Sequence, residues 1–293
     1  VEGMIPSGAV TLVAGESGTY KTFLAHCLAR GVAEGSTFLG RKCVARKVLY
    51  LDRENPPALV RERATLLRLP STDELKIWGA WLDDPPPLLG DPRLLEYAAQ
   101  HAPLMVFDSF IRFHEMDENS ASAMALVMGA ARALANAGSS VVILHHKPKG
   151  DGSHYRGSSD IRAGVDVAYA VSQDSDSGLI SFKCFKNRLA PEFALTLRPE
   201  LESHGDFAVV ETPPRESSND AFRIGEIILA EPGLSQGQLL KRCGIRERRA
   251  VVILKEYEGK LWRVAIGSHR ARCYYPLSES KETAQSAGLP FAS

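Results

Sequence analysis

The chain has 293 residues, of which 44% are hydrophobic, enough for a sizeable buried core, and this argues against a wholly disordered chain. Lys and Arg together number 35, as do Asp and Glu, so the formal net charge is zero. Bulk charge therefore gives no indication of a nucleic-acid partner, and any basic surface must be local.

The five cysteines form no C-x-x-C pair. This argues against a zinc site or a disulfide framework and favours a reducing, cytoplasmic environment. The sequence begins at Val1 without a basic segment followed by an apolar run, and no window approaches 18 uninterrupted apolar residues. We therefore expect neither a signal peptide nor a membrane span. The absence of an initiator Met is typical of a trimmed chain or a fragment.

Short apolar runs alternate with helical patterns over the first two-thirds of the chain. Such runs, without a period of two, are typical of strands covered on both faces, and their alternation with helices predicts a mainly parallel α/β sheet. The predicted strands are 10–14, 47–52, 104–108, 140–145 and 165–172, and the predicted helices are 21–33, 58–67 and 120–137. The antiparallel strands expected further along are 179–186, 193–198 and 206–211.

Changes in composition predict the domain organisation. The α/β domain is expected at 1–212, followed by a polar, proline-containing linker at 213–220. A second compact unit is expected at 221–277, and the polar tail at 278–293 is expected to be loose.

The strongest motif follows the first predicted strand and opens the first predicted helix. It consists of Gly15, Glu16, Ser17, Gly18, Thr19, Tyr20, Lys21 and Thr22. A loop in this context presents backbone N–H groups and a helix N-terminus to phosphate oxygens, which predicts an ATP site. Lys21 is expected to reach the β- and γ-phosphates, and the Thr22 hydroxyl to bind Mg²⁺. Tyr20 stands where the motif has glycine, so we expect Gly18 to supply the permissive backbone. The alternative is an ordinary glycine-rich turn.

Two acidic strand ends are expected beside this loop. Asp108 closes an apolar strand and is the candidate for supporting Mg²⁺. Asp52 and Glu54 lie at the end of another strand, and ligands bind at the carboxyl ends of parallel strands. We favour Glu54 as the base that orients the attacking water. The alternative for these acids is a solvated strand end.

Two further strand ends carry candidate groups. His146, in preference to His145, is the candidate γ-phosphate sensor, because an imidazole can hydrogen-bond this phosphate and report its loss. Lys186 and Arg188 are expected on one face, where Arg188 acts with Lys186 as a finger on a neighbouring subunit's ATP. The alternatives are a satisfied surface histidine and two solvated cations.

In chain order, these elements resemble the RecA-like hexameric ATPases, and among them the RepA-type replicative helicases of plasmids and phages. Residues 48–57 resemble that family's catalytic-glutamate strand, 108–119 its metal-binding strand and following loop, and 144–147 its sensor motif. Residues 155–166 resemble its next loop, and 186–188 its trans-acting finger. The resemblance covers about residues 3–210 and implies a RecA-like ATPase domain that forms a homo-oligomer, expected to be a hexamer, with ATP between subunits.

By this resemblance, the loops at 111–119 and 147–160 face a central channel. The second loop combines glycines and an aromatic residue with the cations Lys147, Lys149 and Arg156. This composition suits contact with a single-stranded DNA backbone. An exposed loop without a ligand is the alternative.

Residues 221–277 have the pattern of three helices and a hairpin, similar to a winged helix. A capping box from Ser235 to Gln238 is expected to open the second helix. Between Cys243 and Tyr275 there are eight cations and three acids, a surplus of five. The cations expected to contact duplex DNA are Arg246, Arg248, Arg249, Arg270 and Arg272. A winged helix that docks on protein is the alternative.

The sequence thus favours an ATP- and Mg²⁺-dependent, DNA-binding ATPase that acts as a helicase in the replication of a plasmid- or phage-like element. A DNA-binding ATP switch without unwinding, such as a recombination mediator, helicase loader or regulator, is the second hypothesis. A degenerate nucleotide-binding interaction module is the third, because of Tyr20.

Overall fold

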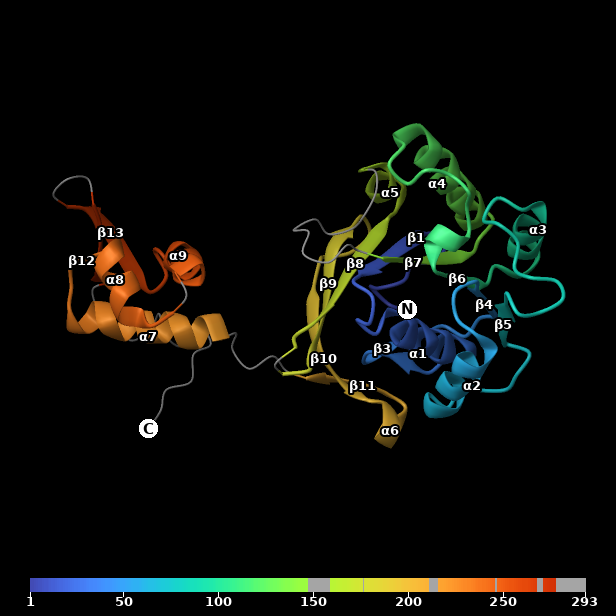
Figure 1. Ribbon diagram of the computed structural model, residues 1–293, viewed down its shortest axis with the longest axis horizontal. Helices are drawn as coiled ribbons and strands as arrows, with labels where there is room; N and C mark the ends of the chain where they lie inside the picture. Colours follow the sequence, from blue (N-terminus) through green and yellow to red (C-terminus); the bar gives the residue numbers. More distant parts are fainter. Residues whose placement is uncertain (147–158, 176, 211–215, 246, 268–270, 278–293) are drawn as a thin grey trace. The chain divides into compact units, whose positions relative to one another are not determined.

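The computed structural model describes residues 1–146, 159–175, 177–210, 216–245, 247–267 and 271–277, the side chains of 159–160, 216–219 and 248–249 excepted. The chain forms two compact units, Val1–Glu211 and Thr212–Ser293 (Figure 1). The expected DNA contacts Lys147, Lys149, Arg156, Arg246 and Arg270 lie outside the described residues.

The first unit is built on a nine-stranded sheet in the order β11-β10-β9-β8-β1-β7-β6-β4-β5. Neighbours from β8 to β5 are parallel, and β9, β10 and β11 continue the sheet antiparallel beside β8. The strands are β1 (Val10–Gly15), β4 (Val48–Asp52), β5 (Leu75–Gly79), β6 (Leu104–Asp108), β7 (Ser140–His146), β8 (Val167–Gln173), β9 (Ile180–Asn187), β10 (Ala194–Glu200) and β11 (Asp206–Val210). The expected mainly parallel α/β fold with antiparallel C-terminal strands is therefore confirmed.

Helices cover both faces of this sheet (Figure 1). The helices of this unit, among the described residues, are α1 (Lys21–Glu34), α2 (Pro57–Leu66), α3 (Pro92–His101), the 3-10 helix η1 (Phe110–Arg112), α4 (Ala121–Asn136), α5 (Ser159–Gly164) and α6 (Leu201–His204), the last between β10 and β11. A short hairpin joins β2 (Thr37–Phe38) and β3 (Arg41–Lys42). The elements predicted from the sequence do not include β2, β3, β5, α3, η1, α5 or α6. β5 is a short edge strand containing Lys76, so its apolar pattern is weak.

Alternation of side chains along the strands builds two cores. On β4, Val48 and Tyr50 belong to the core that includes α1, whereas Leu49 and Leu51 belong to the core that includes α3 and α4. Because successive strand residues point to opposite faces, a continuous apolar run serves both helical layers. The parallel strands consequently end together at one edge, where the polar residues that follow them can meet.

The described residues of the second unit form three helices and a three-stranded sheet in the order β12-β14-β13. Its elements are α7 (Glu216–Ala230), β12 (Leu234–Ser235), α8 (Gln236–Cys243), α9 (Glu247–Glu256), β13 (Trp262–Ile266) and β14 (Arg272–Pro276). Helix α7 begins within the segment expected as a linker, so 216–220 are helical. The capping box at Ser235 and Gln238 is confirmed. Fully buried Trp262, whose Nε1 donates to the Leu254 carbonyl at 3.1 Å, forms part of the unit's core.

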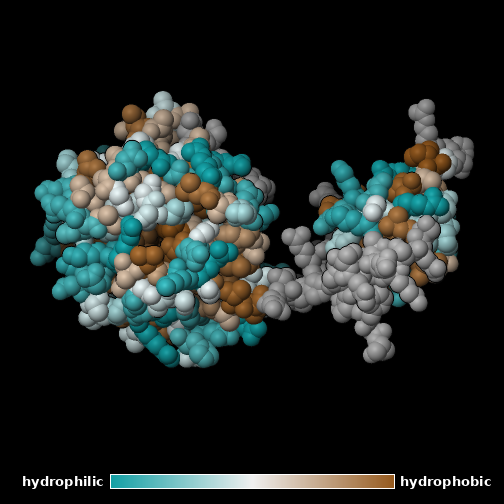
Figure 2. Space-filling model, turned by 180° about the vertical axis from the view of Figure 1, so that it is seen from behind, coloured by the Kyte–Doolittle hydropathy of each residue, from teal (hydrophilic) through white to brown (hydrophobic). Residues whose placement is uncertain are grey.

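The five cysteines are free thiols. Within the described ranges, every helix is too short or too polar to cross a bilayer. Hydrophilic residues cover much of the face drawn in Figure 2, with hydrophobic residues gathered near the middle of the first unit.

Candidate functional site

The phosphate-binding loop connects β1 to α1 with two residues in the left-handed backbone region. Gly18 has φ +83°, and Tyr20, the N-cap of α1, has φ +66°. The expectation that Gly18 takes over the permissive role is therefore incomplete, because Tyr20 itself adopts a conformation that favours glycine. Its ring packs against Phe23 and Phe207, with centroids 5.7 and 6.0 Å away. This aromatic packing offsets part of the backbone cost.

Lys21 lies folded back over the same loop. Its Nζ donates to the carbonyl oxygens of Gly15 at 2.9 Å and Glu16 at 2.6 Å. Burial lowers the pKa of Lys21 to about 8, although the carboxylates of Asp108, Glu54 and Glu16 oppose this. The ammonium is thus held over the loop by two of the loop's own carbonyl oxygens.

Thr22 and Asp108 meet as expected for a magnesium site. The Thr22 hydroxyl donates to Asp108 Oδ2 at 3.0 Å, although the two residues are 86 positions apart. Burial, followed by the neighbouring Asp52 carboxylate, raises the pKa of Asp108 to about 6. A cation beside Asp108 would offset this penalty, so hydroxyl and carboxylate together suit Mg²⁺.

Tyr50 is a member of this site that the sequence analysis missed. Its hydroxyl donates to Asp108 Oδ2 at 2.8 Å, and its buried ring stacks on His26 with centroids 4.4 Å apart. Burial lowers the pKa of His26 to about 3, so the stacked imidazole is neutral. Two residues before Asp52 on β4, Tyr50 shares a strand face with it, which is the signal that could have identified it.

Glu54 and His146 form a pair at the ends of β4 and β7. His146 Nε2 lies 3.2 and 3.3 Å from the two Glu54 carboxylate oxygens. The hydrogen bond from His146 lowers the pKa of Glu54 to about 2, opposed by burial. Ser109 also lowers this pKa, although its hydroxyl makes no hydrogen bond within 3.5 Å among the described residues. Two residues predicted independently are thus brought into contact.

Asp52 has a positioning function in the turn after β4. Its Oδ1 accepts hydrogen bonds from the backbone N–H of Glu54 at 3.0 Å and of Asn55 at 2.9 Å. The Asn55 side-chain amide donates to both carboxylate oxygens. Burial nevertheless raises the pKa of Asp52. Its carboxylate therefore fixes the backbone from which Glu54 projects.

Lys186 and Arg188 lie together, but not beside the phosphate-binding loop. Lys186 Nζ and Arg188 both donate to the carbonyl oxygen of Ala163, at 3.5 and 3.2 Å, at the C-terminal end of α5. Arg188 also pairs with Asp166 at 3.6 Å, and Asp166 accepts from the backbone N–H of Val10. These contacts lie at the start of β1, whereas the loop follows its end.

The expected DNA contacts of the second unit are only partly described. Arg248 and Arg249 belong to α9, and their side chains lie outside the description. Arg272 begins β14 and pairs with Glu258.

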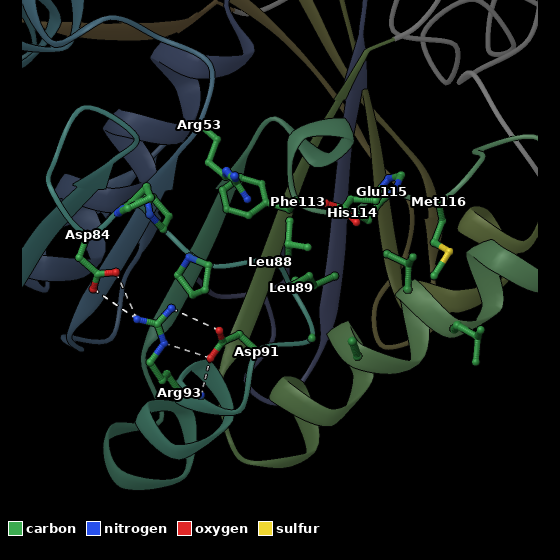
Figure 3. A pocket seen from close by; sticks show the side chains of 17 residues that line it. Arg53, Asp84, Leu88, Leu89, Asp91, Arg93, Phe113, His114, Glu115 and Met116 are labelled. Carbon is green, nitrogen blue, oxygen red and sulfur yellow. Dashed lines mark hydrogen bonds and ion pairs between the residues drawn. The ribbon is translucent and has the colours of Figure 1, made fainter.

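A cavity of about 670 Å³ lies beside the nucleotide site without including Lys21, Glu54 or Asp108. Its walls are residues 84–91, the segment after η1 and part of α4, and its apolar lining includes Phe113 (Figure 3). The Arg53 guanidinium lies 5.7 Å from the centre of the Phe113 ring. No local pattern of residues predicts this cavity, because its walls come from distant segments.

Comparison with known proteins identifies the family and the fold of the first unit. The family model described as AAA domain, AAA_25, matches residues 1–152, more than half of the chain. The structure entitled "ATPase Domain of G40P" is similar with a TM-score of 0.52 and 12% identity, covering 69% of this chain and 85% of that one. A DnaB-like replicative helicase, described with its interactions with primase, is similar with a TM-score of 0.54 and 13% identity, covering 70% and 58%. At these identities the two structures show a shared fold.

A phosphate-binding loop, a buried aspartate hydrogen-bonded to the loop's threonine, and a mainly parallel sheet with an antiparallel edge characterise the first unit. Together with the family match, they establish that the chain belongs to the AAA_25 family of AAA domains and has a RecA-like P-loop fold.

Proposed function

We propose that this protein hydrolyses ATP at the carboxyl edge of its parallel sheet. The observation that carries the proposal is the convergence of Lys21, Thr22, Asp108 and Glu54 on one loop, linked by the Thr22–Asp108 and Glu54–His146 contacts. Lys21 and the loop amides bind the phosphates, and Thr22 with Asp108 holds Mg²⁺, which supplies charge neutralisation for the transferred phosphoryl group.

Glu54 orients and activates the attacking water in this proposal, and His146 responds to the γ-phosphate. The hydrogen bond between them supports these roles, because a phosphate that attracts His146 must also change the surroundings of Glu54. Asp52 and Tyr50 hold Glu54 and Asp108 in place.

Arg188 and Lys186 act on the ATP of a neighbouring subunit. The strand register supports this assignment. Asn187 of β9 lies opposite Val167 of β8, and Val167 in turn lies opposite Thr11 of β1. Thr11 is four residues before Gly15, where the phosphate-binding loop begins. At about 3.3 Å per residue, four residues separate the finger from its own loop by roughly 13 Å. Within one chain the two cations lie away from the phosphates, and this supports a role on the ATP of a second copy.

The assembly we propose is a hexameric ring that moves on single-stranded DNA as a RepA-type helicase in plasmid- or phage-like replication. The similarity of the first unit to the ATPase domain of G40P and to a DnaB-like replicative helicase supports a motor of this kind. Lys147, Lys149 and Arg156 contact the single strand, and the second unit acts as a winged helix on duplex DNA.

Phosphate release with and without single-stranded DNA, together with native mass, tests this function. Wild-type protein is expected to hydrolyse ATP as a ring and to respond to DNA, whereas Lys21→Ala abolishes hydrolysis. When Arg188→Ala protein is mixed in increasing proportion with wild-type protein, ATP turnover is expected to fall more steeply than the fraction of wild-type subunits. Full activity of a monomeric Arg188→Ala protein contradicts the trans role.

The second candidate is a DNA-binding ATP switch without unwinding. The separate second unit, with its three helices and small sheet, favours it, because a ring motor does not require such a unit. Strand displacement on a forked duplex separates the two functions: ATP-dependent DNA binding without displacement supports the switch.

A further inference from the structure

Four side chains form a second cluster just behind the nucleotide site. These four, called here the imidazole cluster, are Phe110, His114, Glu118 and His145. Glu118 Oε1 lies 3.7 Å from His145 Nδ1 and 3.8 Å from His114 Nε2. The Phe110 ring lies against both imidazoles, with centroid distances of 4.6 Å to His114 and 5.7 Å to His145.

This cluster is buried although three of its members are titratable. The exposed fraction of the side chain is 2% for His145, 5% for His114 and 9% for Glu118. Placing such groups out of water is unfavourable unless their charges or polar atoms are compensated. None of the roles assigned to the nucleotide site uses these three residues.

The imidazole cluster lies where the pairing between β6 and β7 stops. The register of these strands ends at Phe107 opposite Ile143, whereas β7 stays paired with β1 as far as Gly15 opposite His146. Beyond this point, the chain after β6 turns into η1. Phe110 and Glu118, both from the β6 side, contact His145 of β7 and so connect the two segments by side chains.

One member of the cluster directly adjoins a residue that contacts Glu54. His145 precedes His146, which hydrogen-bonds Glu54, and Phe110 follows Ser109, the residue after Asp108. Successive residues of a strand point to opposite faces, so His145 points away from the nucleotide side when His146 points toward it. The contacts of His145 with Glu118 and Phe110 therefore lie on the face opposite to that of the Glu54–His146 pair.

We propose that Glu118 is a positioning residue for ATP hydrolysis, which acts through His145 to hold His146 and thereby Glu54 in place. This inference rests on the proposed role of Glu54 in activating water. Glu118 touches neither phosphate nor metal in this scheme, so its loss impairs the chemical step while the loop and Lys21 still bind ATP. A small misplacement of a reacting group is enough to slow catalysis strongly.

Glu118→Gln, His145→Gln and the double variant test the proposal, with Glu96→Gln, an exposed glutamate of α3, as the matched control. Each single variant is expected to lower kcat about 10-fold with less than about a 2-fold change in Mg·ATP affinity by calorimetry. Because both act through one contact, the double variant is expected to lose no more than the greater single loss. Glu118→Asp retains the carboxyl group and is expected to recover part of kcat.

An independent readout follows the imidazole of His146 by NMR of histidine-labelled protein at fixed pH, assigned with His146→Gln. Glu118→Gln is expected to move the His146 signals as well as those of His145, and Glu96→Gln to move neither. Unchanged kcat in Glu118→Gln, parallel losses of kcat and ATP affinity, or a stationary His146 signal overturns the proposal. If wild-type protein binds but does not hydrolyse ATP, the proposed function fails, and the His146 signals still decide whether Glu118 acts through His145.

Discussion

The Tyr50 hydroxyl and the Thr22 hydroxyl both donate to the same oxygen of Asp108, at 2.8 and 3.0 Å. The single carboxylate at the end of β6 is therefore held from β4 and from the first turn of α1. Both bonds favour the ionised form of Asp108 against the burial that raises its pKa. A carboxylate held in this way is ready for a cation, and each of its supports can be removed separately.

Tyr50→Phe removes one of these two hydrogen bonds. The pKa of Asp108 is expected to rise further above about 6, because a donor to the ionised form is lost. ATP turnover should then need about 10-fold more Mg²⁺, in line with the roughly 1.5 kcal/mol of a hydrogen bond to a charged group. Turnover measured against Mg²⁺ concentration checks this, with Tyr97→Phe on α3 as the control. Equal Mg²⁺ dependence in the two variants contradicts a role for Tyr50.

Asp108→Asn is expected to stabilise the metal-free protein near neutral pH while abolishing turnover. Burial raises the pKa of Asp108 from 3.8 to about 6, so the folded state holds this proton more tightly than the unfolded chain. The tighter binding of this proton adds to the free energy of unfolding. This contribution is fully present below about pH 4 and is lost as the pH rises through about 6. Above that pH, the neutral amide avoids a cost of roughly 3 kcal/mol. Thermal unfolding with a chelator at about pH 7.5 and pH 5 measures this, and the gain should shrink at the lower pH.

Tyr20 can be tested by two substitutions that separate backbone strain from packing. Tyr20→Gly removes both the strain of φ +66° and the contacts with Phe23 and Phe207, so the free energy of unfolding should change by less than about 1 kcal/mol. Tyr20→Ala keeps the strain and loses the packing, and is expected to be about 1 kcal/mol less stable than Tyr20→Gly. Denaturant unfolding of the Tyr20→Gly and Tyr20→Ala variants measures this difference in the free energy of unfolding. Equal stabilities would show that the left-handed backbone carries no cost here.

Trp262→Ala tests whether the two units fold and act separately. Trp262 is fully buried in the core of the second unit, and its removal is expected to cost about 3–5 kcal/mol there. The expected result is a lower unfolding midpoint for one calorimetric transition, weaker binding of duplex DNA, and unchanged basal ATP turnover. Loss of turnover in parallel with the second unit contradicts independent folding.

Elements whose signal lies within a few consecutive residues could be predicted without the structure. The phosphate-binding loop was predictable because its backbone groups, lysine and hydroxyl lie within eight consecutive residues. The parallel strands were predictable because burial on both faces requires continuous apolar runs such as Leu104–Asp108. From the order of these strands, Asp108, Glu54 and His146 were expected at one edge.

The contacts between those side chains could not be predicted in the same way. The hydrogen bond from Tyr50 to Asp108 spans 58 positions, and the Glu54–His146 pair spans 92. No sequence period encodes such contacts, because they depend on which strands become neighbours in the sheet and on their register. The left-handed backbone of Tyr20 and the buried contact of Glu118 with His145 likewise depend on rings and strand ends brought in from distant segments. Local pattern fixes the identity of an element, whereas packing between elements fixes which atoms touch.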